Sequence, residues 1–185
     1  MTGLVIFILI VAILGYAVFL YNDLVRKRQL KQEGWSGIDV QLKRRTDLIP
    51  NLLETVKGYM GHERETLEAV TKARADAAAA ANASPEARAK VEGALSGALG
   101  RLLAIAEAYP DLKANTTFLE FQAALQTVEN ELQLSRRYYN GTVRDLNTAV
   151  ESFPSVVVAN MFHFDKAEYF ELENEADRAV PTVKF

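Results

Sequence analysis

The sequence contains no cysteine and only two histidines, His62 and His163. Without cysteine the chain forms no disulfide, offers no thiol nucleophile and cannot take the lipid that anchors lipoproteins. Metal sites in helical bundles are typically built from Glu-x-x-His pairs on facing helices, and the sequence has no such pair. Glycine-rich phosphate loops are also missing. We therefore expect no metal, no cofactor, no catalytic residue and no enzymatic activity.

Charge is missing from residues 4–21, LVIFILIVAILGYAVFLY, and the first charged side chain is Asp23. A run of this length matches the ~20 residues with which a helix crosses the hydrocarbon core of a bilayer. A cleavable signal peptide is the alternative, but it needs a positive segment before the run and a small-residue cleavage site after it. Neither is present, so we interpret residues 1–22 as a single transmembrane anchor that contacts the lipid bilayer.

Lysine and arginine flank this run on one side only. None precedes it, whereas Arg26, Lys27, Arg28 and Lys31 follow it closely. Because flanking Lys and Arg are retained in the cytoplasm, the sequence predicts a single-pass protein with its amino terminus outside and the remainder in the cytoplasm. The formal net charge of -3 argues against a nucleic-acid partner.

Beyond the anchor, apolar residues recur at alternating steps of three and four, which is typical of helices that pack along a seam. The first such run extends from Trp35 to Ala77 and contains Pro50, which removes an amide donor and crowds the carbonyl of Thr46. Either one helix kinks there, or Asp47 caps a new helix. The unbroken phase of the seam favours a kink in a continuous helix.

Two further long helices are expected. Residues 84–108 begin with a serine, a proline and a glutamate, which supply a capping oxygen, a preset first turn and an acid near the positive helix end. Residues 117–153 keep heptad spacing throughout. The sequence thus predicts an all-α fold, in which an elongated antiparallel bundle of three long helices and a short C-terminal helix (residues 23–164) follows the anchor. An acidic segment, residues 165–185, follows the bundle.

Several polar residues stand on or beside the predicted seams, and Arg45 occupies a position at which leucine would pack best. One hypothesis is a structural polar network that joins the helices through buried cross-helix pairs. A solvated helix face and a ligand site are the alternatives. The candidate members are Arg44, Arg45, Asp47, Glu129, Asn130, Arg136 and Asn140.

A strip of small residues marks the helix expected at 84–108. Gly93, Gly97 and Gly100 recur at helical spacing, and each glycine costs ~1 kcal/mol relative to alanine in a helix. Close approach of another helix would explain the strip. Chance composition in a helix rich in small residues is the alternative.

The helix expected at 117–153 is ~54 Å long against ~36 Å for the helix at 84–108, so it extends past its neighbour. Its overhang is apolar and needs a cover, which the first helix, the C-terminal segment or a second copy of the chain could supply. Residues 22–45 carry seven Lys or Arg and three acids, while residues 165–178 carry six acids and two bases. We expect a homo-oligomer formed through the helix at 117–153 and the acidic C-terminal segment, with a contact of the same residues inside one chain as the alternative. The candidate packing surface comprises Gly93, Gly97, Gly100, Tyr138, Tyr139, Leu146 and Phe153.

Several ordered blocks of the sequence carry a resemblance to a known family. They are YNDLV, WSGIDVQLKRRTDLIPNLLETVKGYMGHE, LSGALGRLLAIAEAYPDLKAN, RRYYNGTVRDLNTAVESFPS and the terminal VPTVKF. Over nearly its whole length the chain resembles the LemA family of bacterial membrane-anchored proteins. The resemblance implies a protein of the bacterial inner or plasma membrane with an outside amino terminus and a cytoplasmic helical bundle. It supplies no reaction, cofactor or catalytic residue.

Two classes of function fit these observations. The first is a membrane-anchored, non-enzymatic helical scaffold that self-associates at the cytoplasmic face of the membrane. The second is a regulatory adaptor for another membrane protein, such as a protease or sensor kinase, that acts without self-assembly. The size of the solubilised particle separates the two.

Overall fold

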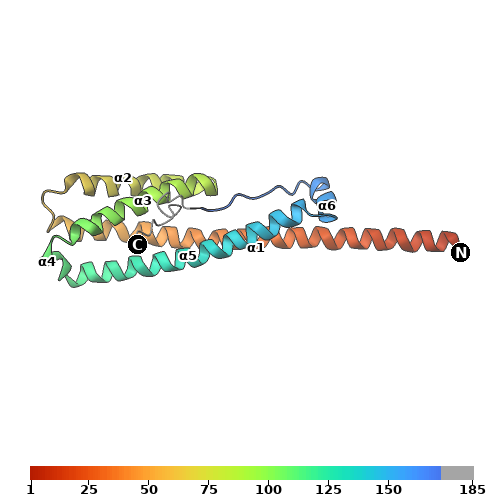
Figure 1. The fold of residues 1–185 in the computed structure, drawn as a ribbon, viewed down its shortest axis with the longest axis horizontal. Helices are drawn as coiled ribbons and strands as arrows, with labels where there is room; N and C mark the ends of the chain where they lie inside the picture. Colours follow the sequence, from red (N-terminus) through yellow and green to blue (C-terminus); the bar gives the residue numbers. More distant parts are fainter. Residues whose placement is uncertain (172–185) are drawn as a thin grey trace, which may run out of the picture. The chain divides into compact units, whose positions relative to one another are not determined.

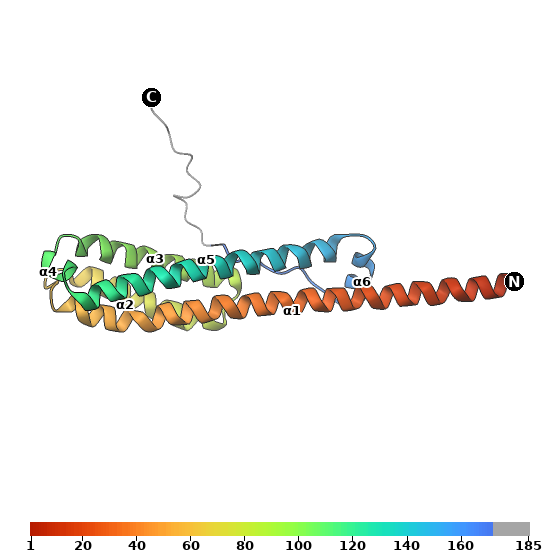
Figure 2. The ribbon, with the colours of Figure 1, turned by 90° about the horizontal axis from the view of Figure 1, so that it is seen from below.

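The computed structural model describes residues 1–171, and every regular element among them is helical. The elements are, in chain order, α1 (Thr2–Lys57), α2 (Arg64–Ala79), the 3-10 helix η1 (Ala80–Asn82), α3 (Pro85–Ala106), α4 (Pro110–Lys113), α5 (Thr116–Glu151) and α6 (Ser155–Met161) (Figure 1, Figure 2). The expected all-α class with one long apolar N-terminal helix is confirmed. Of the expected acidic segment, residues 172–185 lie outside the described part of the chain.

The chain divides into two compact units, to both of which α1 and α5 contribute. Unit 1 contains residues 1–38 and 135–169, and unit 2 contains residues 39–134 together with residues 170 and 171. Each unit has its own apolar core.

Unit 2 packs the end of α1, α2, α3 and the beginning of α5 around one core. The connections are short, and the helices reverse direction at each of them (Figure 1). The spacing of apolar residues explains the packing, because buried positions recur at steps of three and four along each helix. Among the least exposed members of this core are Ile49, Leu52, Leu95, Leu102, Leu112 and Phe118.

The helix α1 passes through Pro50 without a break, as the phase of its seam suggested. Proline has no amide hydrogen, so the carbonyl of Thr46 loses its donor within the helix. Arg74 of α2 replaces that donor, because its Nε donates to the Thr46 carbonyl at 3.1 Å. A neighbouring helix thus satisfies the backbone group that the proline leaves open.

The first long helix expected from the seam is divided in two, so the structure has four long helices rather than three. The break lies at residues 58–63, GYMGHE, where two glycines lower the helix propensity by ~1 kcal/mol each. The connection is held from outside: the Tyr59 hydroxyl accepts from Asn115 Nδ2 at 2.9 Å, and the Tyr109 hydroxyl donates to the Glu63 carboxylate. The sequence did not predict this turn, because apolar residues keep their helical spacing on both sides of it.

Unit 1 packs the first part of α1 against the second half of α5, with α6 and the segment after it as a cover. Its core contains Leu24, Leu146, Val150, Val158, Ala159 and Phe164. The C-terminal segment (residues 162–169) is extended and bound to α5 by polar contacts. Asn147 donates from Nδ2 to the Ala167 carbonyl at 3.0 Å and accepts from the Ala167 amide at 2.8 Å. The Tyr139 hydroxyl donates to the Glu168 carbonyl at 2.9 Å.

Close approach between α1 and α5 depends on Gly34. A Cβ at this position would lie 3.1 Å from the Tyr139 Cα and 3.3 Å from the Tyr138 ring. A Cβ at Gly37, one helical turn further on, would meet only Ser135, at 3.7 Å and beyond. A side chain at Gly34 would crowd the backbone of α5, whereas a side chain at Gly37 would fit, although both glycines lie in the same helix of unit 1.

Gly34→Ala is expected to destabilise the protein by about 1 kcal/mol, because crowding of the α5 backbone outweighs the gain of helix propensity. Gly37→Ala is the matched control and should stabilise it by up to about 1 kcal/mol. Urea unfolding of the full-length variants in detergent, followed by circular dichroism, measures both. Equal effects of the two substitutions would contradict the assigned contact.

Arg74→Ala should cost about 1.5 kcal/mol, because a charged donor is removed from the Thr46 carbonyl. In a Pro50→Ala background the new amide donates to the same carbonyl, so Arg74→Ala should cost about 1 kcal/mol less there. Lys72→Ala, which removes an exposed cation paired with Asp76 on the same helix, serves as the control and should show no coupling to Pro50. Thermal unfolding of the wild type, the two single variants and the double variant measures these costs. If the effects of Arg74→Ala and Pro50→Ala on the free energy of unfolding simply add, Arg74 does not replace the missing donor.

Candidate functional site

A buried ion network joins α1, α3 and α5 in unit 2. Arg45 is 2% exposed, and its guanidinium donates to the carboxylate of Glu92, which is 1% exposed. It also donates to the Ser96 hydroxyl at 2.8 Å and to Glu129 Oε2 at 3.3 Å. Arg45 lies on the apolar face of α1 between Leu42 and Ile49, so its charged side chain points into the core.

A second arginine extends this network. Arg88 is buried at the start of α3 and its Nη1 lies 2.7 Å from Asp39 Oδ1 on α1. The same atom donates to the Ala81 carbonyl at 2.9 Å, and Nε lies 4.0 Å from Glu92. Removing a charge from water costs several kcal/mol, which such ion pairs and hydrogen bonds must offset. The network therefore ties three helices together in one register.

The other candidate polar residues lie away from this network. Arg44 donates to Gln41 at 3.2 Å, and Asp47 pairs with Lys43 at 3.4 Å, in both cases at the surface of α1. Asn130 accepts from Gln126 one turn earlier in α5. Arg136 and Asn140 are half-buried in unit 1. Of the seven candidates, the structure brings only Arg45 and Glu129 into contact.

The candidate packing surface also separates into parts. Tyr139 and Leu146 are buried inside unit 1, so they are not available to a second chain. Tyr138 and Phe153 are exposed. Apart from the adjacent residues and the backbone of α3 itself, no atom of the described residues lies within 4 Å of a Cβ placed at Gly93, Gly97 or Gly100, so no other described helix approaches this strip closely.

Local hydrogen bonds and burial account for the pKa shifts of three side chains. A hydrogen bond from Tyr109 lowers the pKa of Glu63 and raises that of Tyr109 itself. Burial, and to a smaller extent the charge of Glu168, raises the pKa of Tyr139 to about 12. Within residues 1–171, no group of three His, Cys, Asp or Glu side chains is placed to hold a metal ion.

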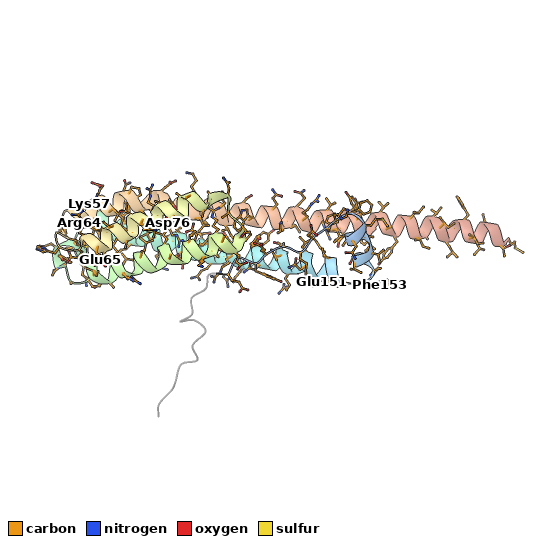
Figure 3. All side chains as sticks on the ribbon, turned by 90° about the horizontal axis from the view of Figure 1, so that it is seen from above. Lys57, Arg64, Glu65, Asp76, Glu151 and Phe153 are labelled. Carbon is orange, nitrogen blue, oxygen red and sulfur yellow. The ribbon has the colours of Figure 1, made fainter. Side chains whose placement is uncertain are left out.

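The ligand alternative has little to support it in unit 2. Arg44, Asp47 and Leu48 of α1 and Ala124, Thr127 and Val128 of α5 line a shallow surface hollow. Its two charged side chains are exposed, and Asp47 is already paired with Lys43. Charged residues of α2 such as Arg64, Glu65 and Asp76 lie at the surface of the bundle (Figure 3).

The apolar end of α1 is the other prominent feature. Its side chains from Leu4 to Val18 are exposed, apart from the half-buried Ala17, and among the described helices only α1 is long and apolar enough to cross a membrane. Asp23 follows this end, paired with Arg26 at 2.7 Å and Lys27 at 3.2 Å. Although burial opposes it, pairing with these two cations lowers the pKa of Asp23. The first charge after the apolar run is thus neutralised locally.

Sequence reasoning missed several residues of the ion network and the close approach at Gly34. The sequence could have predicted the burial of Arg88 and Glu92, because they lie one heptad before Leu95 and Leu99 and so share a helix face with these leucines. No pattern in the sequence indicates the roles of Ser96 and Asp39, because only the fold brings them to Arg45 and Arg88. Gly34 resembled every other glycine until the position of Tyr139 was known.

A family model described as the LemA family matches residues 34–185. The chain belongs to the LemA family. The match includes Arg45, Arg88, Glu92 and Glu129, and it begins at Gly34. The resemblance found in the ordered sequence blocks is confirmed.

Three relatives place the LemA-family chain more closely. It is 23% identical over 197 residues to "Magnetosome protein MamQ 2" of Paramagnetospirillum magneticum, covering 94% of this chain and 72% of the relative. It is 22% identical over 197 residues to "Magnetosome protein MamQ" of Magnetospirillum gryphiswaldense, with the same coverage. It is 27% identical over 164 residues to "Protein LemA" of Metamycoplasma hominis, covering 85% of this chain and 74% of the relative.

The family and the names of these relatives agree on the kind of protein to which the chain is similar. None of these names denotes an enzyme, and together with the apolar end of α1 the family and its relatives suggest a membrane-associated protein.

Glu92→Gln is expected to destabilise the LemA-family chain by about 3 kcal/mol, because it leaves the Arg45 charge buried without its closest counter-charge. Glu129→Gln is the matched control. This carboxylate is 35% exposed at its side chain and lies 3.3 Å from Arg45, so its loss should cost about 1 kcal/mol or less. Urea midpoints of the full-length proteins in detergent measure the difference, and equal costs would contradict the ranking of the two pairs.

Proposed function

We propose that the protein is a membrane-anchored, non-enzymatic helical scaffold that self-associates at the cytoplasmic face of a bacterial inner or plasma membrane. The anchor is the apolar end of α1. The helical segments of unit 2 supply the assembling surface.

The observation that carries the self-association is the uncovered glycine strip of α3. Three glycines in one helix forgo about 3 kcal/mol of helix propensity relative to alanine. The described chain gains no close contact in return, because nothing approaches Gly93, Gly97 or Gly100. A helix of a second molecule would recover that cost by approaching the bare backbone.

The overhang of α5 does not support assembly. Within unit 1, Tyr139 and Leu146 are covered by α1, α6 and the C-terminal segment, so the contact inside one chain accounts for them. Self-association is therefore proposed through α3 in preference to α5, and the expected contribution of the acidic segment falls mostly on residues 172–185, which lie outside the described residues.

The second candidate is a regulatory adaptor for another membrane protein, such as a protease or sensor kinase. The intramolecular cover of α5 favours it, because a protein that satisfies its own overhang can act as a monomer. In that case the glycine strip would receive a helix of a different protein.

Gly97→Leu is expected to dissociate the detergent-solubilised particle toward the 20.6 kDa protomer, because a large side chain blocks close helix approach. Ala87→Leu, at an exposed position of α3 outside the strip, is the matched control and should leave the particle size unchanged. Light scattering coupled to size-exclusion chromatography gives the protein mass. A monomeric wild type would favour the adaptor, whereas an assembly insensitive to Gly97→Leu would remove α3 from the interface.

The orientation is tested on intact cells. Because the chain has no cysteine, single cysteines at Thr2 and at exposed Arg144 report accessibility without background. A membrane-impermeant maleimide should label Thr2→Cys in intact cells, and it should label Arg144→Cys only after permeabilisation, following the distribution of flanking Lys and Arg. The reverse pattern would overturn the proposed orientation.

A further inference from the structure

We propose that α6 and the turn before it form a second membrane contact, in which Phe153, Val157, Met161 and Phe162 insert into the boundary between headgroups and acyl chains. This contact rests on the proposed anchoring by α1. It adds an interfacial, non-spanning element beside the span.

The exposed side chains of this segment are unusually apolar. Phe153 is 84% exposed, Met161 67%, Val157 54% and Phe162 53%. No Asp, Glu, Lys or Arg lies between Glu151 and Asp165. An exposed apolar patch of large side chains without interspersed charge is typical of an interaction surface.

Contacts within unit 1 fix the position of this patch along α1. Val158 and Ala159 of α6 share a core with Leu24, against which Leu20 and Tyr21 also pack. The Phe162 ring lies 4.8 Å from the Tyr21 ring, edge to face. Both ribbon views show α6 beside α1, and Figure 3 labels Phe153 at the adjoining end of α5 (Figures 1–3).

The length of the span selects lipid as the occupant. Residues 4–21 form ~27 Å of helix, which nearly fills a hydrocarbon core ~30 Å thick. Residues 20–25, and α6 beside them, then fall at the edge of that core. Aromatic side chains such as Tyr21 are enriched at this depth, and apolar residues of surface helices are buried ~5–10 Å into the same boundary.

The charges next to the patch agree with a lipid surface. Arg26 and Lys27 pair with Asp23, and the Arg28 guanidinium lies 5.0 Å from the centre of the Phe164 ring. These cations follow the span within one or two helical turns, where each contributes about 1 kcal/mol of attraction to anionic headgroups. A second copy of the chain would need a surface complementary to the patch, whereas the bilayer is already present beside it.

The absence of cysteine allows a direct measurement of depth. Single cysteines replace Phe153, Val157 or Met161, carry a nitroxide spin label, and are studied as full-length protein in vesicles of phosphatidylethanolamine and phosphatidylglycerol. Leu9→Cys in the apolar run is the lipid control, and Arg144→Cys, at an exposed site on α5 of unit 1, is the aqueous control. Collision with oxygen reports lipid, and collision with a water-soluble nickel chelate reports water.

The three labels should collide with the nickel chelate at least about threefold less than the Arg144 label, with oxygen access between those of the Arg144 and Leu9 labels, as expected at interfacial depth. Nickel access equal to that at Arg144, while Leu9 reads lipid, would overturn the α6 contact and leave the anchor standing. If Leu9 also reads water, both the anchor and the contact fail. Protection from both reagents with spin–spin broadening would assign the patch to a second copy and overturn the proposal.

A charged variant adds an independent test. Val157→Asp combined with Met161→Asp places charge on the exposed side of α6 and leaves the buried Val158 and Ala159 in place. The label at residue 153 should then regain the nickel access of the Arg144 control, while circular dichroism stays unchanged. Persistent protection in this variant would show that the protein itself shields the label, and would overturn the proposal.

Discussion

Burial of the Arg45 charge is the constraint on which the arrangement of unit 2 depends. A guanidinium has a planar set of donors and no way to lose its charge, so the core must supply acceptors where they point. Glu92 and Ser96 on α3 and Glu129 on α5 do so for the two terminal nitrogens, Nη1 and Nη2. Leucine seams alone tolerate shifts by one heptad, whereas this set of contacts fits one register. The network thus selects among packings that the apolar residues leave nearly equivalent.

At Pro50, too, a neighbouring helix supplies the hydrogen-bond partner that α1 lacks. A proline inside a long helix opens a carbonyl, and the donor comes from Arg74 of a different helix. Continuity of α1 in unit 2 is therefore a tertiary property, since the helix alone would lack this hydrogen bond. In unit 1 the corresponding role falls to Gly34, where a missing side chain lets α5 approach.

Periodicity predicted the helices and the class of fold, and the absence of charge predicted the long apolar N-terminal helix, because these depend on the residues of one segment alone. It also predicted that α1 continues through Pro50. It failed at residues 58–63, where the apolar phase runs on through a turn made by two glycines and side-chain contacts from Asn115 and Tyr109. Arg45 stood out as a charge on a seam, but its main partner Glu92 lies on the helix expected at 84–108, where the sequence drew attention to the glycine strip instead. The cover of Tyr139 by the C-terminal segment required knowledge of the fold.

The uncovered glycine strip of α3 has a consequence for the entropy of any association there. Immobilising a flexible side chain at an interface costs about 0.5–1.5 kcal/mol, and glycine has no rotamers to lose. A helix that docks on Gly93, Gly97 and Gly100 pays this cost on its own side only. Close approach at such a face would also let Cα–H groups of the glycines contact backbone carbonyls of the docked helix.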